Sequence, residues 1–212
     1  MSQNTSSAVM QQRSEPHNSL DDFPTPPWAT RALLNHLNQG FDLDKMTCRE
    51  PAANRGHMVK PLEEYFEAVL CSDIHDYGVG YKVDDYLFGD LPETVDWTIT
   101  NPPFKLAEQF IERMMLTSKQ GCAVIVRSAF LEGVGRYNRL FSLKPPSHVI
   151  QFSERVVMHR GKLSEKGSTA TAYCWLVWER PVARLRSPFP QHTDLGWMDP
   201  CRKRFEKPGD YE

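Results

Sequence analysis

The chain has 212 residues, of which 40% are hydrophobic and 25% charged, a balance that suits one globular domain and excludes a disordered chain. No apolar run reaches the ~20 residues that span a bilayer, and residues 1–19 lack the apolar core of a secretory signal. Five cysteines without a CxxC pair argue against a disulfide framework or a zinc site. We therefore expect a cytoplasmic protein with no membrane partner.

The formal net charge of −2 hides an uneven distribution along the chain. Residues 1–100 carry 16 acidic and 7 basic side chains, whereas residues 101–212 carry 11 acidic and 18 basic ones. This split favours two halves that face different partners, one of them a polyanion. The simpler interpretation is that charges scattered along a sequence do not cluster in space.

The composition divides the chain into a flexible N-terminal arm, a folded domain and a C-terminal tail. These segments cover residues 1–20, 21–180 and 181–212. Residues 21–28 are too rich in proline for a helix or a strand, which predicts an ordered loop. Pro27 suits the first turn of a helix that continues to about Asn38.

Short apolar runs then alternate with helical patterns. Strands are predicted at 46–49, 68–71, 83–87, 97–100, 123–126, 149–152 and 171–178. Helical spacing recurs between residues 58 and 66 and again between residues 106 and 121. The last two strands have no helix between them. We expect an α/β fold with a seven-stranded mixed sheet, largely parallel, and a terminal antiparallel hairpin.

The strongest chemical signal is Asn101-Pro102-Pro103-Phe104, which directly follows the predicted strand 97–100. Ligand-binding residues of open α/β sheets gather at the carboxyl ends of strands. Two prolines remove two N–H donors and leave carbonyl oxygens free to accept, while Asn101 adds a side-chain acceptor. Together with the flat ring of Phe104, they can hold an amine that is attached to a planar group. The simpler interpretation is a turn between a strand and a helix.

This tetrad resembles the (D/N)PP(Y/F/W) motif of amino-group methyltransferases that use S-adenosylmethionine. That family includes N6-adenine DNA methyltransferases, adenine-modifying RNA methyltransferases and enzymes that methylate glutamine side chains. The resemblance covers about residues 21–180 and implies a Rossmann-like class I methyltransferase fold with S-adenosylmethionine as cofactor. A narrower similarity to small, phage-like adenine methyltransferases rests on the segments 127–133 and 168–173.

A loop after the first predicted strand is similar to the cofactor loop of this family, in which an acidic residue and a proline precede G-x-G. Here Glu50 and Pro51 precede Asn54 and Gly56, so an asparagine replaces the first glycine. Asparagine is the non-glycine residue that best tolerates a positive φ, so the departure is mild. The resemblance assigns these four residues to the cofactor.

Two acidic positions follow. The resemblance implies that Asp73 accepts hydrogen bonds from ribose hydroxyls and that Ile74 packs on the adenine of the cofactor. A carboxylate suits the first task because it is purely an acceptor. Asp85 and Tyr86 resemble the third cofactor motif, whose acid contacts the adenine amine, and Asp84 is an alternative to Asp85.

Phe23, Thr25 and Pro26 resemble the proline-rich motif that these enzymes place before the first strand. The resemblance implies that this motif contacts the methionine part of the cofactor, with the Thr25 hydroxyl and backbone N–H on its carboxylate.

The basic side chains between the last two predicted strands form a candidate substrate contact. Arg155, Arg160 and Lys162 can bind phosphates there, although an ordinary solvated loop is the simpler interpretation. The seven histidines show no metal-ligand spacing, so we expect no metal.

The sequence therefore predicts an enzyme that methylates the exocyclic amine of adenine in DNA. Asn101 and the Pro102 carbonyl would accept the amine hydrogens. Sequence specificity is expected to be short or relaxed, because the segments 153–170 and 181–212 show no helical stripe with which to read bases. The alternatives are an RNA adenine methyltransferase, a protein-glutamine methyltransferase, and a catalytically inactive nucleic-acid-binding module on the same fold.

Overall fold

The computed structural model describes residues 21–180 and 192–211; the predicted arm over residues 1–20 lies outside this part of the chain. The strands are β1 (Thr47–Glu50), β2 (Ala68–Asp73), β3 (Lys82–Val83), β4 (Val95–Thr100), β5 (Ser118–Arg127), β6 (His148–Phe152), β7 (Tyr173–Glu179) and β8 (Asp194–Met198). The helices are α2 (Pro27–Leu37), η1 (Leu43–Lys45), α3 (Val59–Glu63), α4 (Ala107–Thr117), η2 (Ser128–Leu131), α5 (Val134–Arg136), η3 (Tyr137–Phe141) and α6 (Arg202–Phe205).

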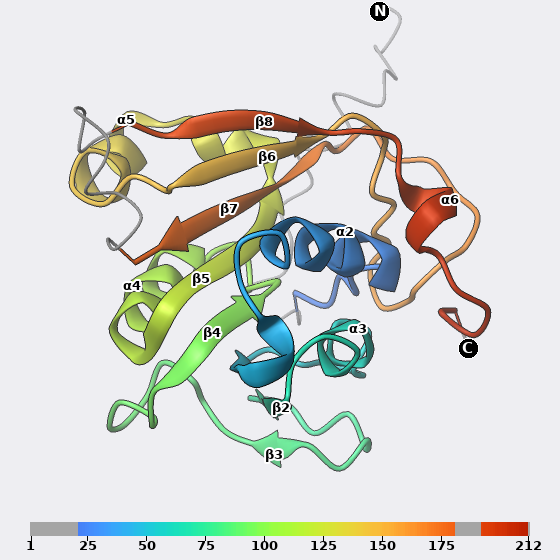
Figure 1. The fold of residues 1–212 in the computed structure, drawn as a ribbon, viewed down its shortest axis with the longest axis horizontal. Coiled ribbons are helices and arrows are strands. Elements are labelled where there is room, and N and C mark those ends of the chain that lie inside the picture. The colour runs from blue at the N-terminus through green and yellow to red at the C-terminus, as the bar shows by residue number, and fades with distance from the viewer. Residues whose placement is uncertain (1–20, 181–191, 212) are drawn as a thin grey trace, which may run out of the picture.

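The strands form one mixed sheet in the order β3-β2-β1-β4-β5-β7-β6-β8 (Figure 1). The first five in this order run parallel, and β7 is antiparallel to both β5 and β6. The predicted α/β fold and its antiparallel hairpin are confirmed. The predicted number of seven strands is wrong, because β8 pairs in parallel with β6 and covers the hairpin's outer edge.

Apolar side chains fill both faces of the sheet. Helices α2 and α3 pack on one face, where the indole rings of Trp28, Trp97 and Trp175 are fully buried. Helix α4 lies on the other face of the sheet (Figure 1). Its buried side chains there are Phe110, Ile111 and Met114. Pro27 begins α2 as predicted. No helix among the described residues is long and apolar enough to cross a membrane.

Two of the differences between predicted and observed boundaries have a clear structural cause. Helix α4 ends at Thr117, not near Gly121, because β5 follows it directly. A Cβ on Gly121 would lie 2.5 Å from the Trp178 carbonyl oxygen, so this glycine permits the close β5–β7 pairing. The strand predicted at 83–87 is shortened to β3, because Tyr86 turns inward and its hydroxyl lies 3.2 Å from the Thr117 hydroxyl.

The segment after β8 is fastened to the first helix by an ionic contact. Arg31 of α2 is only 4% exposed, and its guanidinium donates to Asp210 at 2.7 Å and to Glu64 at 2.8 Å. It also donates at 2.8 Å to the carbonyl of Phe205, the last residue of α6. The described part of the predicted tail therefore packs on the domain rather than extending from it.

We predict that Arg31→Ala lowers the free energy of unfolding by about 3–5 kcal/mol, because it leaves the buried Asp210 carboxylate without its cation. Urea unfolding measures this change. Lys45→Ala is the control, since it removes a solvent-exposed ion pair with Asp42 and should leave the free energy of unfolding nearly unchanged. Equal effects of the two substitutions would contradict the prediction.

Candidate functional site

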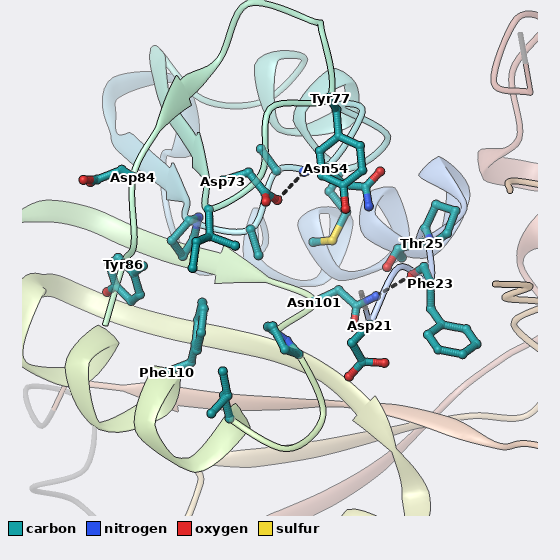
Figure 2. Close-up of a pocket in the computed structure, with 18 of the residues that line it drawn as sticks. Asp21, Phe23, Thr25, Asn54, Asp73, Tyr77, Asp84, Tyr86, Asn101 and Phe110 are labelled. Carbon is teal, nitrogen blue, oxygen red and sulfur yellow. Dashed lines mark hydrogen bonds between the residues drawn. The ribbon is translucent and has the colours of Figure 1, made fainter. Parts of the chain in front are cut away.

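The order of the strands creates a crevice at one edge of the sheet. The chain runs outward from β1 to β2 and β3, then returns to β4 on the other side of β1. Such a switch point is where open α/β sheets bind ligands, at the carboxyl ends of the strands. A pocket of about 850 Å³, including its open mouth, lies there (Figure 2).

Ten of the residues predicted for the site line this pocket. They are Phe23, Thr25, Pro51, Asn54, Asp73, Ile74, Asp85, Tyr86, Asn101 and Pro103. The structure thus brings together predicted residues from the loops after β1, β2 and β4 and from the loop before α2. It also named residues that do not line the pocket: Pro26, Glu50, Gly56, Pro102, Phe104, Arg155, Arg160 and Lys162.

The side chain of Asn101 is held in one orientation at the end of β4. Its Nδ2 donates to the Phe23 carbonyl oxygen at 2.8 Å (Figure 2). This bond assigns Oδ1 as the free end of the amide. Oδ1 is buried and has no hydrogen-bond partner among the residues that the structure describes. Because a buried acceptor without a partner is unfavourable, this atom is suited to a ligand that brings an N–H or O–H donor.

Phe104 packs at the rim and not on the pocket wall. Its backbone N–H donates to Asp21 Oδ2 at 2.5 Å, which fixes the turn after Pro103. The centre of the Arg127 guanidinium lies 4.2 Å from the Phe104 ring centroid, and the Phe23 ring lies 5.6 Å away. One face of the predicted stacking ring is therefore covered by a cation from the end of β5.

Asp73 lies at the end of β2 and faces the pocket (Figure 2). Its Oδ2 accepts the Asn54 N–H and its Oδ1 accepts the His75 N–H, each at 2.9 Å. A carboxylate has about four acceptor positions, so each oxygen retains one for a ligand hydroxyl.

The loop after β1 has the conformation that its residues indicate. Asn54 adopts a φ of +52°, and Gly56 one of +86°. A Cβ on Gly56 would meet the Tyr81 hydroxyl oxygen, and the φ of +86° is one that other residues rarely adopt, so glycine is favoured at this position. Gly56 therefore shapes the loop from behind, whereas Asn54 lies on the pocket wall.

Glu50 is buried beneath the pocket. Its Oε1 accepts the Thr100 hydroxyl at 2.5 Å and the Ala52 N–H at 2.9 Å. Oε2 is buried, and no described residue bonds to it. Burial raises the pKa of the Glu50 carboxyl to about 8. Glu50 thus supports the loop after β1 from the interior and does not line the pocket.

The wall opposite Asn101 contains the third predicted motif. Asp84 and Asp85 both line the pocket, so the structure leaves both acids as candidates. Tyr86 is buried and its ring packs 5.3 Å from that of Phe110, which forms an apolar floor. At the other end, Thr25 Oγ1 is buried and lacks a hydrogen bond within the described part of the chain. Pro26 lies behind it as the N-cap of α2.

The basic loop between β6 and β7 reaches the same edge of the molecule. Its Gly161 N–H donates to the Asp22 carbonyl oxygen at 2.8 Å. Arg160 and Lys162, which flank Gly161, are exposed beside the segment that forms one wall of the pocket. Arg155 is also exposed, nearer the end of β6.

Sequence reasoning missed about half of the lining. The missed residues are Asp21, Pro24, Ala52, Ala53, His57, Met58, Tyr77, Leu87, Leu106 and Phe110. Most are apolar neighbours of the predicted motifs, and proximity to those motifs was the available signal. No group of three or more His, Cys, Asp or Glu side chains within residues 21–180 and 192–211 could hold a metal ion.

Comparison with solved structures establishes the fold. The chain is similar to a protein from Listeria monocytogenes assigned as a class I S-adenosylmethionine-dependent methyltransferase (TM-score 0.62, 14% identity, 89% of this chain and 68% of that one). It is also similar to a protein from Pyrococcus horikoshii assigned as an RNA methyltransferase, with a TM-score of 0.58 and 16% identity over 82% of this chain and 96% of that one. A third similar structure is the methyltransferase subunit of a type I restriction-modification system from Streptococcus thermophilus, with a TM-score of 0.60 and 12% identity over 90% of this chain and 50% of that one.

This chain therefore has the Rossmann-like class I methyltransferase fold. It spans half the length of the Streptococcus subunit. No protein-family model matches the chain, and no curated protein gives a significant sequence match.

We predict that the free energy of unfolding falls as the pH rises from about 4.5 to 8, because of Glu50. The folded state keeps the carboxyl protonated up to a pKa of about 8, whereas the unfolded chain releases this proton above its ordinary pKa of 4.5. Glu50→Gln cannot ionise, so its gain in Tm over the wild type should be small at pH 5 and largest near pH 8.

Thermal unfolding at the two pH values tests this expectation. The exposed Glu63→Gln is the control, since it removes a carboxyl that is not buried. A gain for Glu50→Gln that does not depend on pH would show that Glu50 is ionised in the folded protein.

Proposed function

We propose that this protein transfers a methyl group from S-adenosylmethionine to the exocyclic amine of adenine in DNA. The observation that carries the proposal is the buried, unpartnered Asn101 Oδ1, whose orientation is fixed by the Phe23 carbonyl. It faces a pocket at the switch point of a class I methyltransferase fold. An acceptor placed in this way suits a substrate that presents an N–H.

The residues of the pocket fit S-adenosylmethionine, which when bound supplies an electrophilic methyl group on a sulfonium. Asp73 keeps free acceptor positions for the two ribose hydroxyls. Asp84 or Asp85 could accept from the adenine amine, with Phe110 and Ile74 as apolar surroundings. The Thr25 hydroxyl, which lacks a bond in the described structure, could donate to the methionine carboxylate.

Asn101 would act on the acceptor amine. The lone pair of an aromatic amine is delocalised into the ring, which makes the nitrogen a poor nucleophile. Accepting one of its hydrogens at Asn101 Oδ1 localises the lone pair on nitrogen; the Pro102 carbonyl, predicted as a second acceptor, does not line the pocket. Fixed positioning of this kind supplies several kcal/mol of barrier reduction. No strong general base is required, because the proton can leave to water after the transfer.

A nucleic acid is the substrate class that the surrounding charges favour, because its phosphates are anionic. Arg127 lies over the rings of Phe23, a lining residue of the pocket, and Phe104, while the exposed Arg160 and Lys162 flank Gly161, whose N–H donates to the Asp22 carbonyl oxygen. Such side chains position a protein on phosphates without reading sequence. A base in a duplex must leave the stack to reach a buried acceptor. It would then meet the paired side chains of Phe104 and Arg127, since bases stack on both aromatic rings and guanidinium planes. Specificity would be short or relaxed.

Incubation with methyl-labelled S-adenosylmethionine and separate pools of DNA, RNA and protein tests the proposal. Label in N6-methyladenine of the DNA pool is expected. Label in RNA or in glutamine would identify one of the two other activities. Cofactor or DNA binding without transfer to any pool would identify an inactive binding module.

Asn101→Ala should lower single-turnover transfer by about 100- to 1000-fold, the usual effect of losing one preorganised hydrogen-bonding group at a reaction centre. Cofactor affinity, measured by calorimetry, should stay within several-fold because the main contact is to the acceptor amine. Wild-type turnover in this variant would remove Asn101 from the reaction.

DNA affinity should fall steeply with salt, because phosphate contacts release counterions. Charge reversal at Arg160 and Lys162 should flatten the slope of log affinity against log salt concentration. The matched control is reversal of Lys45 and Lys119, which changes the net charge equally but lies at the opposite strand ends. Equal slopes for the two double variants would exclude the loop as the phosphate contact.

A further inference from the structure

Three residues that precede α2, Asp21–Phe23, make polar contacts with three separate parts of the site. We call this segment the strap. Its contacts reach the cofactor loop after β1, the turn after β4, and the basic loop between β6 and β7. The strap has no regular secondary structure of its own, so these contacts hold it in place.

Asp22 fastens the strap to the cofactor loop. Its Oδ1 accepts from Asn54 Nδ2 at 2.7 Å, and its Oδ2 lies 3.0 Å from the Arg55 guanidinium. The Asp22 side chain is 9% exposed, which strengthens both bonds relative to a surface pair. Arg55 also lies over the Tyr77 ring at 4.8 Å, so the loop that carries Tyr77 joins the same cluster.

This contact explains the residue at position 54. A glycine there would satisfy the φ of +52° and keep the backbone bond to Asp73, but it could not reach Asp22. Asn54 therefore does more than tolerate a strained backbone. Its side chain connects the cofactor loop to the strap.

The neighbouring strap residues set the geometry of the acceptor. The Phe23 carbonyl holds the Asn101 amide so that Oδ1 points into the pocket, and the Asp21 carboxylate holds the Phe104 N–H. The Asp22 carbonyl accepts the Gly161 N–H of the basic loop. A displacement of the strap would therefore disturb the cofactor wall, the amide orientation and the basic loop together.

We propose that Asp22 and Asn54 are positioning residues which, by fixing the strap, keep the cofactor wall and the Asn101 amide in register. This inference rests on the proposed methyl transfer. It deepens that proposal, because it assigns to side chains outside the reaction centre a role in the step at the acceptor amine as well as in cofactor retention.

Two substitutions test the side-chain contact alone. Asn54→Gly keeps the backbone conformation, and Asp22→Ala leaves Arg55 and Asn54 with access to water. Each should weaken S-adenosylmethionine binding about three- to tenfold, the range for one hydrogen bond. The double variant should bind S-adenosylmethionine no more weakly than the single variant with the lower affinity. Lys45→Ala, which removes a distant ion pair, is the control.

Turnover at saturating cofactor and DNA distinguishes a positioning role of Asp22 and Asn54 from a role in cofactor binding alone. We expect kcat to remain at least fivefold below the wild type in both variants, because the Phe23 carbonyl no longer holds the Asn101 amide. Full recovery of kcat at saturation would overturn the inference and leave Asp22 and Asn54 as cofactor contacts only.

Amide hydrogen exchange in the protein without cofactor gives a readout that does not depend on activity. Exchange at Gly161 and Phe104 should become at least fivefold faster in Asp22→Ala than in the wild type and the Lys45→Ala control. Unchanged exchange at both amides would show that the Asp22 side chain does not hold the strap in place, and would overturn the inference. If exchange is faster in Asp22→Ala but the wild-type protein neither binds S-adenosylmethionine nor transfers a methyl group, the role of Asp22 in fixing the strap stands and the proposed function is refuted.

Discussion

The parallel pairing of β1 with β4 is the constraint on which the site depends. These strands are separated by more than 40 residues, yet Cys48 lies opposite Trp97 and Arg49 opposite Thr98. Trp97 and Ile99 are fully buried in the α2 side of the core, which fixes which face each residue of β4 presents. A slip of one residue would turn the indole ring of Trp97 to the opposite face. The register therefore also sets where Asn101 leaves the sheet.

The same register brings two polar side chains together beneath the pocket. Thr100 and Glu50 are both buried, and their hydrogen bond spans the junction of β4 and β1. A protonated Glu50 adds no negative charge to a pocket whose lining already contains Asp21, Asp73, Asp84 and Asp85. The acids at the pocket come from the first half of the chain. Arg127, Arg160 and Lys162, which do not line the pocket, come from the second half, so the excess of acidic residues in the first half of the sequence corresponds in part to the acidic lining of the pocket.

Features that depend only on residues next to one another in the sequence could be predicted. The strand before Asn101 is β-branched and aromatic, so its position followed from local pattern. Asp73 lies two residues beyond the apolar run 68–71, and its resemblance to a cofactor motif indicated it. Contacts made by the folded chain could not be predicted in this way. Nothing in residues 21–23 indicates that they contact the turn after β4, and Glu50 gives no sign that it points inward.

Two further features depended on the whole fold. β8 has exposed Leu195 and Trp197 around Gly196 and lacks the alternating pattern of a half-buried strand, so only its pairing with β6 reveals it. The Arg127 guanidinium reaches Phe104 because β5 lies beside β4 in the sheet, although the two residues are 23 positions apart.

The ionic contact of Arg31 also bears on the order in which the protein can fold during synthesis. Asp210, which pairs with this guanidinium, is added 179 residues later. While the ribosome makes the intervening chain, the Arg31 guanidinium can pair with Glu64 alone, and water must solvate the N–H groups that Asp210 and the Phe205 carbonyl accept from in the finished fold. The face of α2 that holds Arg31 therefore remains open until residues near 210 emerge. Completion of this domain is a late event, in which the segment around α6 closes over a helix translated near the beginning.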